Sequence, residues 1–231
     1  ENTFSYNFIL NSFFGFFFII SNVLFSICVA KNDTIKKFYF FKEFQPIIIF
    51  FLIFCLYTFV LNVIVLNNYK NLSVVIFSIF FLQIVYILKN FLHLKPLIYF
   101  NLKIDEKLIL LVFFSLFLIS ILPMSDADSM SIYQYLPIVI FNEGLSEINL
   151  VQNLEFTLLS NTETILLLSS IFKSDNLGAQ LNLISLVFFI LIKFKEHKNF
   201  SLIVLSSPLI IYFISTQKLQ LFFGLLYLLL F

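Results

Sequence analysis

Residues Pro123–Gly144, PMSDADSMSIYQYLPIVIFNEG, interrupt a chain that is otherwise built largely from long apolar runs. The apolar run Leu108–Leu122 ends directly before this stretch, and Asp126 and Asp128 follow soon after it. An ionisable side chain this close to membrane hydrocarbon is costly, so a pair of them there indicates a functional site. We therefore take the stretch as the candidate site and the apolar runs as its scaffold.

The composition excludes an ordinary soluble domain. Hydrophobic residues make up 61% of the chain, charged residues only 12%, and the mean hydropathy is +1.02. These values predict an all-α, polytopic transmembrane helix bundle that has the lipid bilayer as its partner. The chain has no basic block of the kind that binds nucleic acid, so we expect no nucleic-acid partner. Cys28 and Cys55 lie inside apolar runs, which argues against a disulfide framework.

Spans are predicted where an apolar run approaches the roughly 20 residues that a helix needs to cross the hydrocarbon. Residues 1–107 are expected to form three leading spans, and residues 108–231 a second unit. The predicted spans are Phe8–Val29, Pro46–Leu66, Ser73–Leu92, Leu108–Leu122, Ala179–Ile192, Phe200–Ser215 and Leu219–Phe231. The chain starts at Glu1 and stops within an apolar run, so we expect it to be a fragment of a longer protein.

The distribution of charge predicts the orientation. Between Leu108 and Phe172 there is no Lys, whereas Lys residues gather after the first and third predicted spans and again at 193–198. By the positive-inside rule the Lys-rich loops are cytoplasmic, and residues 123–178 form a long extracytoplasmic loop of a multi-pass plasma (inner) membrane protein. Within that loop, Thr157–Phe172 contains Glu163, so we expect it to lie along the membrane surface or to re-enter rather than to cross.

Asp126 and Asp128 are the candidate catalytic residues. In an extended turn, which Pro123 and Ser125 favour, two carboxylates at this spacing can converge on one ligand. They can act as a general base at the membrane surface or hold a divalent cation such as Mg²⁺ or Mn²⁺. A helix is expected to follow, with its start signals between Asp128 and Ser131, a kink at Pro137 and its last residue at Glu143, where Gly144 stops it. The alternative is that both are solvated loop carboxylates that only support the topology.

Four further side chains are candidates for substrate binding: Tyr133, Tyr135, Lys173 and Lys218. The tyrosines can donate hydrogen bonds to a substrate, but Tyr is also common in the aromatic belt at membrane interfaces. The lysines can neutralise a phosphate beside the membrane, although a Lys that snorkels to the interface is a common structural feature.

The order of these elements resembles the amino-terminal half of the GT-C superfamily of polytopic membrane glycosyltransferases, which includes protein O-mannosyltransferases and aminoarabinose transferases. The resemblance spans Leu108–Phe231 and includes the small-residue turn at 176–179. It is carried by Asp126, Asp128, Ser129, Tyr133, Leu136, Pro137 and Gly144. It implies membrane-parallel helices in the first external loop, an acidic residue there as base or metal ligand, a polyprenyl-phosphate sugar donor, and a glycan, lipid or protein acceptor.

The sequence therefore predicts a glycosyltransferase that uses a lipid-linked donor on the extracytoplasmic face. A transporter or flippase is one alternative, although the predicted spans offer only Asn22, Asn62, Gln83 and Asn182 as mid-membrane polar groups. A polymerase or ligase of surface glycans, with a similar external loop, is the other.

Overall fold

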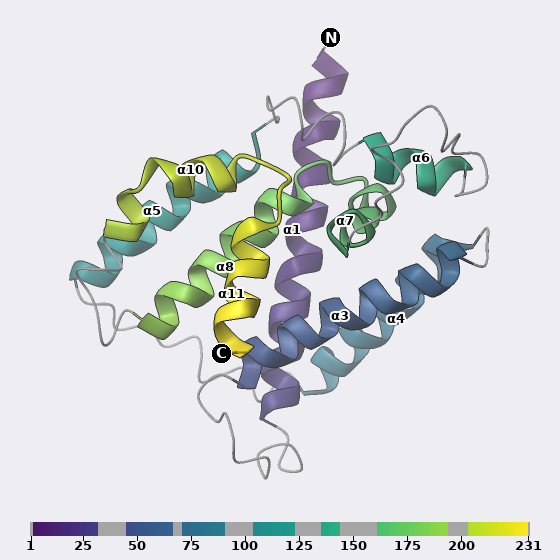
Figure 1. Ribbon diagram of the computed structural model, residues 1–231, viewed down its shortest axis with the longest axis horizontal. Coiled ribbons are helices and arrows are strands. Elements are labelled where there is room, and N and C mark those ends of the chain that lie inside the picture. The colour runs from purple at the N-terminus through teal and green to yellow at the C-terminus, as the bar shows by residue number, and fades with distance from the viewer. Residues whose placement is uncertain are drawn as a thin grey trace.

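The computed structural model describes residues 2–31, 45–66, 71–90, 104–122, 135–143, 161–193 and 203–230. Over these residues the regular structure is entirely helical, which confirms the predicted all-α class (Figure 1). The helices are α1 (Asn2–Ala30), α3 (Gln45–Leu66), α4 (Leu72–Lys89), α5 (Ile104–Ser120), α6 (Tyr135–Glu143), α7 (Asn161–Phe172), α8 (Leu177–Lys193), α10 (Pro208–Ile214) and α11 (Gln220–Leu230).

Within the described ranges, three helices are long and apolar enough to cross a membrane: Asn7–Ala30 in α1, Gln45–Val65 in α3 and Leu72–Lys89 in α4. A fourth crossing is added if the bent pair α7 and α8 counts as one broken span. Helices suit this setting because all their central backbone groups are bonded internally, and hydrocarbon supplies no other partners. The structure thus supports a membrane protein, and the three leading spans coincide closely with α1, α3 and α4.

Large apolar side chains cover the outer faces of these helices. Phe14 is 54% exposed, Phe81 66% and Leu88 66%. Monomeric soluble proteins rarely expose apolar patches of such extent. These faces are suited to contact with lipid chains.

α1 is the central helix of the structure and packs against α3, α4, α7 and α8 (Figure 1). Its Phe18 is 0% exposed and stacks on Phe172 of α7, with 4.2 Å between the ring centroids. Tilted and edge-on contacts join the same ring to Phe54, Tyr57 and Phe80. Aromatic pairs in these arrangements add to the energy of close packing. Phe residues from four helices therefore make the centre of the main core.

A second core lies on the other side of α8. It joins α8 to α5 and α10 through Ile109, Leu116, Leu186 and Ile214, and Figure 1 shows α5 and α10 on the side of α8 away from α3 and α4. α8 therefore forms the wall that the two cores share.

The predicted span Phe200–Ser215 is interrupted in the structure. Residues 203–206 form one helical turn, and α10 begins only at Pro208, after Ser207 in an extended conformation. Proline has no N–H for the preceding turn and disfavours helix in the residue before it, so the helix restarts there. At about 1.5 Å per residue, α10 by itself is far too short to cross the hydrocarbon.

α6 ends at Glu143, as the sequence predicts, and begins at Tyr135. Pro137 therefore lies in the first turn of α6, where its missing N–H costs no hydrogen bond.

α7 lies in the predicted external loop. It is buried from Ile165 to Phe172 apart from a half-buried Ser170. The position of the loop relative to the bilayer stays a prediction.

We expect Phe18→Ala to destabilise the protein by about 3 kcal/mol or more, because it removes a buried ring with several aromatic contacts and leaves a cavity. Phe14→Ala is the matched control on the same helix and should have little effect, since Phe14 is largely exposed. The measurement is the temperature at which half of the detergent-solubilised protein loses its monodisperse gel-filtration peak. Equal losses for the two variants would contradict the assignment of Phe18 to the core.

Candidate functional site: the elbow between α7 and α8

The chain turns sharply between α7 and α8. The two helices are bent by 114° at a break of four residues, Lys173–Asn176, which we call the elbow. Lys173 has a left-handed backbone, with φ of 52°. Its N–H donates to the carbonyl of Ser170, and the N–H of Ser174 donates to the carbonyl of Ser169 at 2.8 Å. This is the Schellman helix end, in which a left-handed residue, usually Gly, satisfies the last carbonyls and stops the helix.

The Asn176 side chain connects the elbow by a hydrogen bond to Leu122, the residue before the acidic stretch Pro123–Gly144. Its side-chain Nδ2 donates to the carbonyl of Leu122 at 3.0 Å and lies 3.5 Å from Ser12 Oγ on α1. Gln180, one turn further along α8, donates to the carbonyl of Ser12 at 2.8 Å. Leu122 directly precedes Pro123, so the elbow fixes the point at which the chain enters the stretch that carries the candidate carboxylates.

A second set of contacts connects the first turn of α8 to the turn before α11. The N–H of Gly178, in the first turn of α8, donates to Gln217 Oε1 at 2.6 Å. The first N–H groups of a helix have no partner within it, so Gln217 supplies a cap from a distant part of the chain. A Cβ on residue 178 would come within 2.6 Å of the Gln217 carbonyl oxygen and 2.9 Å of its Cα. Only glycine permits this approach without a shift of the backbone.

Asn182 of α8 bonds backbone groups at the end of α10 and at the beginning of α11. Its Oδ1 accepts from the N–H groups of Leu221 and Phe222, at 3.2 and 3.3 Å, in the first turn of α11. Its Nδ2 donates to the carbonyls of Phe213 at 2.8 Å and Lys218 at 2.6 Å. One buried amide of α8 thus holds both the end of α10 and the beginning of α11. Gly178 and Asn182 of α8 therefore join this helix to the turn at 215–219 by several hydrogen bonds.

The elbow and the first turn of α8 also contain buried oxygen atoms that accept no hydrogen bond. In the part of the chain that the structure describes, these include Ser174 Oγ, Asn176 Oδ1 and Gln180 Oε1. A methyl group on Gly15 of α1 would overlap Ser174 Oγ and lie 2.9 Å from Gln180 Oε1. The backbone of α1 therefore packs directly against these two side chains. An unsatisfied buried polar atom costs about 1–3 kcal/mol, and native proteins retain few of them. Each such group in a native interior requires an explanation, such as a bound water molecule, an ion or a functional role.

The structure describes only some of the predicted site residues. Asp126, Asp128 and Tyr133 lie outside the described residues, as does the side chain of Tyr135, whose backbone begins α6.

Both predicted lysines are described, and they belong to the two turns that Gly178 and Gln217 join. Lys173 is an exposed residue of the elbow. Lys218 is half-buried before α11, and its Nζ donates to the Tyr212 hydroxyl at 3.4 Å. The two lysines therefore lie near the same end of α8.

Asp175 is a carboxylate that the sequence analysis did not single out. It lies in the elbow, two residues after Lys173 and next to Asn176. Part of its surface is exposed, but the protein on its other side excludes water and raises the pKa of its carboxyl. A carboxyl with a raised pKa beside polar groups is a candidate acid or base. The sequence feature that could have identified Asp175 is its position as a carboxylate between two apolar helical segments.

In the described ranges, no group of three or more His, Cys, Asp or Glu side chains is placed to hold a metal ion. The cation site predicted at Asp126 and Asp128 is outside those ranges and stays a prediction.

Comparison of the chain with protein-family models, with curated proteins and with solved structures finds no match. The functional assignment therefore depends on the arrangement of this chain's own residues.

Gly178→Ala is expected to prevent normal assembly, because its methyl group would meet the backbone of Gln217. Gly224→Ala, in α11, is the matched control. An added Cβ there meets no atom within 4 Å, and Ala is favoured over Gly in a helix by about 1 kcal/mol. Yield of monodisperse protein and its thermal midpoint measure both effects. A Gly178→Ala variant as stable as wild type would refute the close approach.

We further expect Asn182→Ala to destabilise the protein more than Asn176→Ala does. Loss of Asn182 leaves two carbonyls and two N–H groups without their partner, whereas loss of Asn176 removes one clear bond, to Leu122. Each polar group left unsatisfied in the interior costs about 1–3 kcal/mol. The comparison is made by thermal unfolding in detergent, and the reverse order would contradict the capping role of Asn182.

Proposed function

We propose that this chain is part of a membrane glycosyltransferase, which transfers a sugar from a polyprenyl-phosphate donor to an acceptor on the extracytoplasmic face. The observation that carries the proposal is the hydrogen bond from Asn176 to the Leu122 carbonyl. It connects the polar elbow to the entrance of the stretch that bears Asp126 and Asp128. Polar groups held in fixed positions by packed helices are what a catalytic site requires.

In the proposed reaction, Asp126 or Asp128 accepts the proton of an acceptor hydroxyl. The acceptor oxygen forms a bond to the anomeric carbon of the sugar as the bond from that carbon to the phosphate oxygen breaks. The configuration at that carbon is inverted, and polyprenyl phosphate leaves. Lys173 or Lys218 offsets the negative charge that gathers on the phosphate as the bond breaks. A divalent cation held by the two aspartates is the alternative source of that positive charge.

The extracytoplasmic placement follows from the predicted topology. Nucleotide sugars are made in the cytoplasm, so a transfer centre on the outer face has to use a donor that crosses the membrane in lipid-linked form. Such a donor enters sideways from the bilayer and meets a site at the level of the head groups. The two lysine-bearing turns at one end of α8 suit that entry.

A transporter or flippase is the second candidate, because the 114° break between α7 and α8 resembles the discontinuous helices that form transporter sites. Against it, two of the polar side chains available within the helices have structural partners. Gln83 accepts from the buried Tyr57 hydroxyl at 2.8 Å, and Asn182 caps α11. A polymerase or ligase of surface glycans shares the chemistry proposed above and differs in the acceptor.

The central test replaces each aspartate in the full-length protein. Asp128→Asn or Asp126→Asn is expected to abolish sugar transfer from a polyprenyl-phosphate donor without lowering membrane abundance, because the amide cannot accept the proton. Glu147→Gln is the control and should transfer sugar at the wild-type rate. Transfer is measured with a radiolabelled sugar in membrane vesicles. Wild-type turnover by both aspartate variants would exclude them as the base and leave Asp175 as the next carboxyl to replace.

The topology has its own test. A tag inserted near Asn149 is expected to be reachable from outside the intact cell. A tag reachable only from the cytoplasm would overturn both the orientation and the proposal of an external transfer centre.

A further inference from the structure

α7 begins beside the end of a membrane span. Thr164, near the start of α7, donates a hydrogen bond to Asn62 Oδ1 of α3 at 3.1 Å. Asn62 lies three residues before Val65, where the span in α3 ends. The next span begins at Leu72, so this end of α3 and the start of α4 lie at the same side of the bilayer. The first half of α7 therefore lies at that side.

α7 ends at the middle of two spans. Its last residue, Phe172, stacks on Phe18 of α1 and makes an edge-on contact with Phe80 of α4. Phe18 is the twelfth of the 24 residues in its span, and Phe80 is the ninth of the 18 residues in its own. Both rings thus lie halfway along helices that are long enough to cross the membrane. α7 therefore leads from one side of the bilayer to its centre.

α8 continues from the centre to the opposite side. Near its start it packs against Gly15, the ninth residue of the span in α1 and about 12 Å from the beginning of that span. Near its end, Phe188 contacts Phe50, the sixth of the 21 residues in the span of α3. The two helices thus form one crossing of a hydrocarbon layer about 30 Å thick. Of the two positions expected for Thr157–Phe172, along the surface or re-entrant, these contacts favour entry into the membrane.

Three buried side chains at this break have oxygen atoms that accept no hydrogen bond. Ser174, Asn176 and Gln180 are each 0% exposed. The amide nitrogens of Asn176 and Gln180 donate to the carbonyls of Leu122 and Ser12, which fixes the orientation of both amides. Their oxygens are therefore left without a donor.

Two of these oxygens meet at one point of α1. A Cβ on Gly15 would overlap Ser174 Oγ and lie 2.9 Å from Gln180 Oε1, so both atoms reach the space that the missing side chain leaves. Hydrocarbon has no donor to offer them. The partner that satisfies them is therefore a small polar or positively charged guest.

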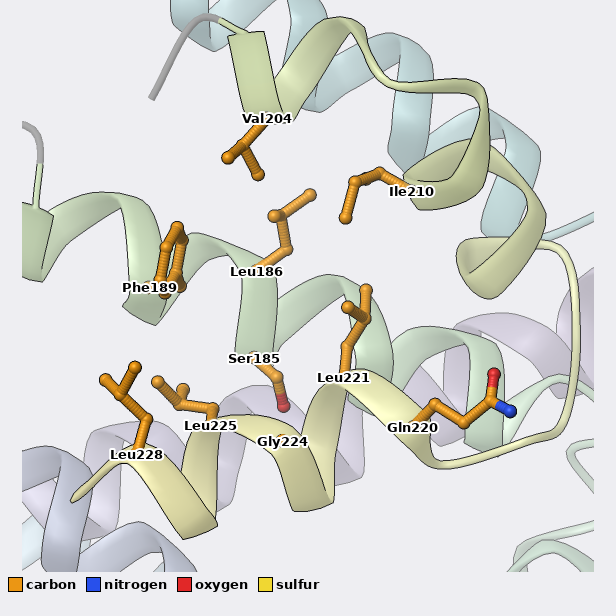
Figure 2. A pocket seen from close by; sticks show the side chains of 10 residues that line it. All are labelled: Ser185, Leu186, Phe189, Val204, Ile210, Gln220, Leu221, Gly224, Leu225 and Leu228. Carbon is orange, nitrogen blue, oxygen red and sulfur yellow. The ribbon is translucent and has the colours of Figure 1, made fainter. Parts of the chain in front are cut away.

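The other side of α8 has a different character. An apolar cavity of about 220 Å³ lies there, between α8, α11 and the chain around α10 (Figure 2). Among the described residues that line it, Ser185 and Gln220 are the polar ones, and Ser185 Oγ already donates to the Leu181 carbonyl at 2.8 Å. The unsatisfied oxygens of the elbow are thus on the face of α8 that packs against α1.

We propose that the elbow binds a monovalent cation inside the membrane, through the oxygens of Ser174, Asn176 and Gln180. Neutral oxygens at a break in a membrane helix can replace the water around Na⁺. A divalent cation requires carboxylate ligands or retained water. Lys173 and Asp175, the charged residues of the elbow, are both exposed and opposite in sign, so the buried oxygens form a neutral site. The inference concerns binding and does not depend on the proposed transfer reaction.

The experiment measures the binding of radioactive Na⁺ to the full-length protein in lipid nanodiscs, with choline chloride holding the ionic strength constant. Wild type should bind Na⁺ saturably. Ser174→Ala removes one ligand oxygen and no hydrogen bond of that oxygen, so the Kd should rise about tenfold or more. Ser169→Ala is the matched control and should bind as wild type does, because Ser169 Oγ already donates to the Leu166 carbonyl.

A second measurement needs no variant. The thermal midpoint of wild type should be higher in sodium chloride than in choline chloride, since a ligand that binds only the folded state stabilises it. Absence of saturable Na⁺ binding and of this shift would mean that water alone occupies the elbow, and would overturn the proposal. Unchanged binding in Ser174→Ala, or equal losses in both serine variants, would overturn it as well.

The depth of the elbow is tested with Phe172→Trp, which introduces a tryptophan into a chain that has none. The tryptophan fluorescence that the variant adds to wild type should be quenched more by lipids brominated near the ends of their chains than by lipids brominated near the head group. The opposite order would place α7 at the membrane surface and exclude an intramembrane cation site.

Discussion

Helix ends in an apolar environment have backbone N–H and carbonyl groups that neither the helix nor hydrocarbon can satisfy. This constraint organises the structure around α8. Gln217 caps the first turn of α8 from the turn before α11, and Asn182 of α8 caps the first turn of α11. The exchange of buried amides brings two helix ends together that are far apart in the sequence. α10 is held as well, since Asn182 also bonds the Phe213 carbonyl.

The same constraint explains the elbow. α7 stops with a left-handed Lys173 that completes the Schellman hydrogen bonds, and the chain then turns into α8. Asn176 occupies the position before α8, where an Asn often caps its own helix. Here Gln217 supplies a cap to Gly178, and the Asn176 amide bonds Leu122 instead. Gln217, which is distant in the sequence, thus takes the capping role that Asn176 would usually have. The Asn176 side chain instead connects the elbow to the acidic stretch.

This arrangement links the fold to the proposed chemistry. The elbow packs on α1 at Gly15 and Ser12, where it is held against the centre of the main core. The turn with Lys218 is locked to it through Gln217. The entrance to the acidic stretch and the two lysine-bearing turns are therefore joined through α8. In the transfer that we propose, this connection would hold the phosphate of the donor and the carboxylate that acts as base in fixed relative positions.

The sequence by itself determined the helical class, the leading spans α1, α3 and α4, and the end of α6 at Glu143, because apolar length and helix-stop residues act locally. It identified Lys173 and Lys218 as candidate phosphate-binding residues but did not show that they lie near the same end of α8, and it left out Asp175. The tertiary structure decided the roles of Asn176, Asn182, Gln217 and Gly178. Each acts on a backbone group that is far away in the sequence, so their partners depend on how α8 crosses α7 and α11. Composition and periodicity do not encode that crossing, and only the packed helices supply it.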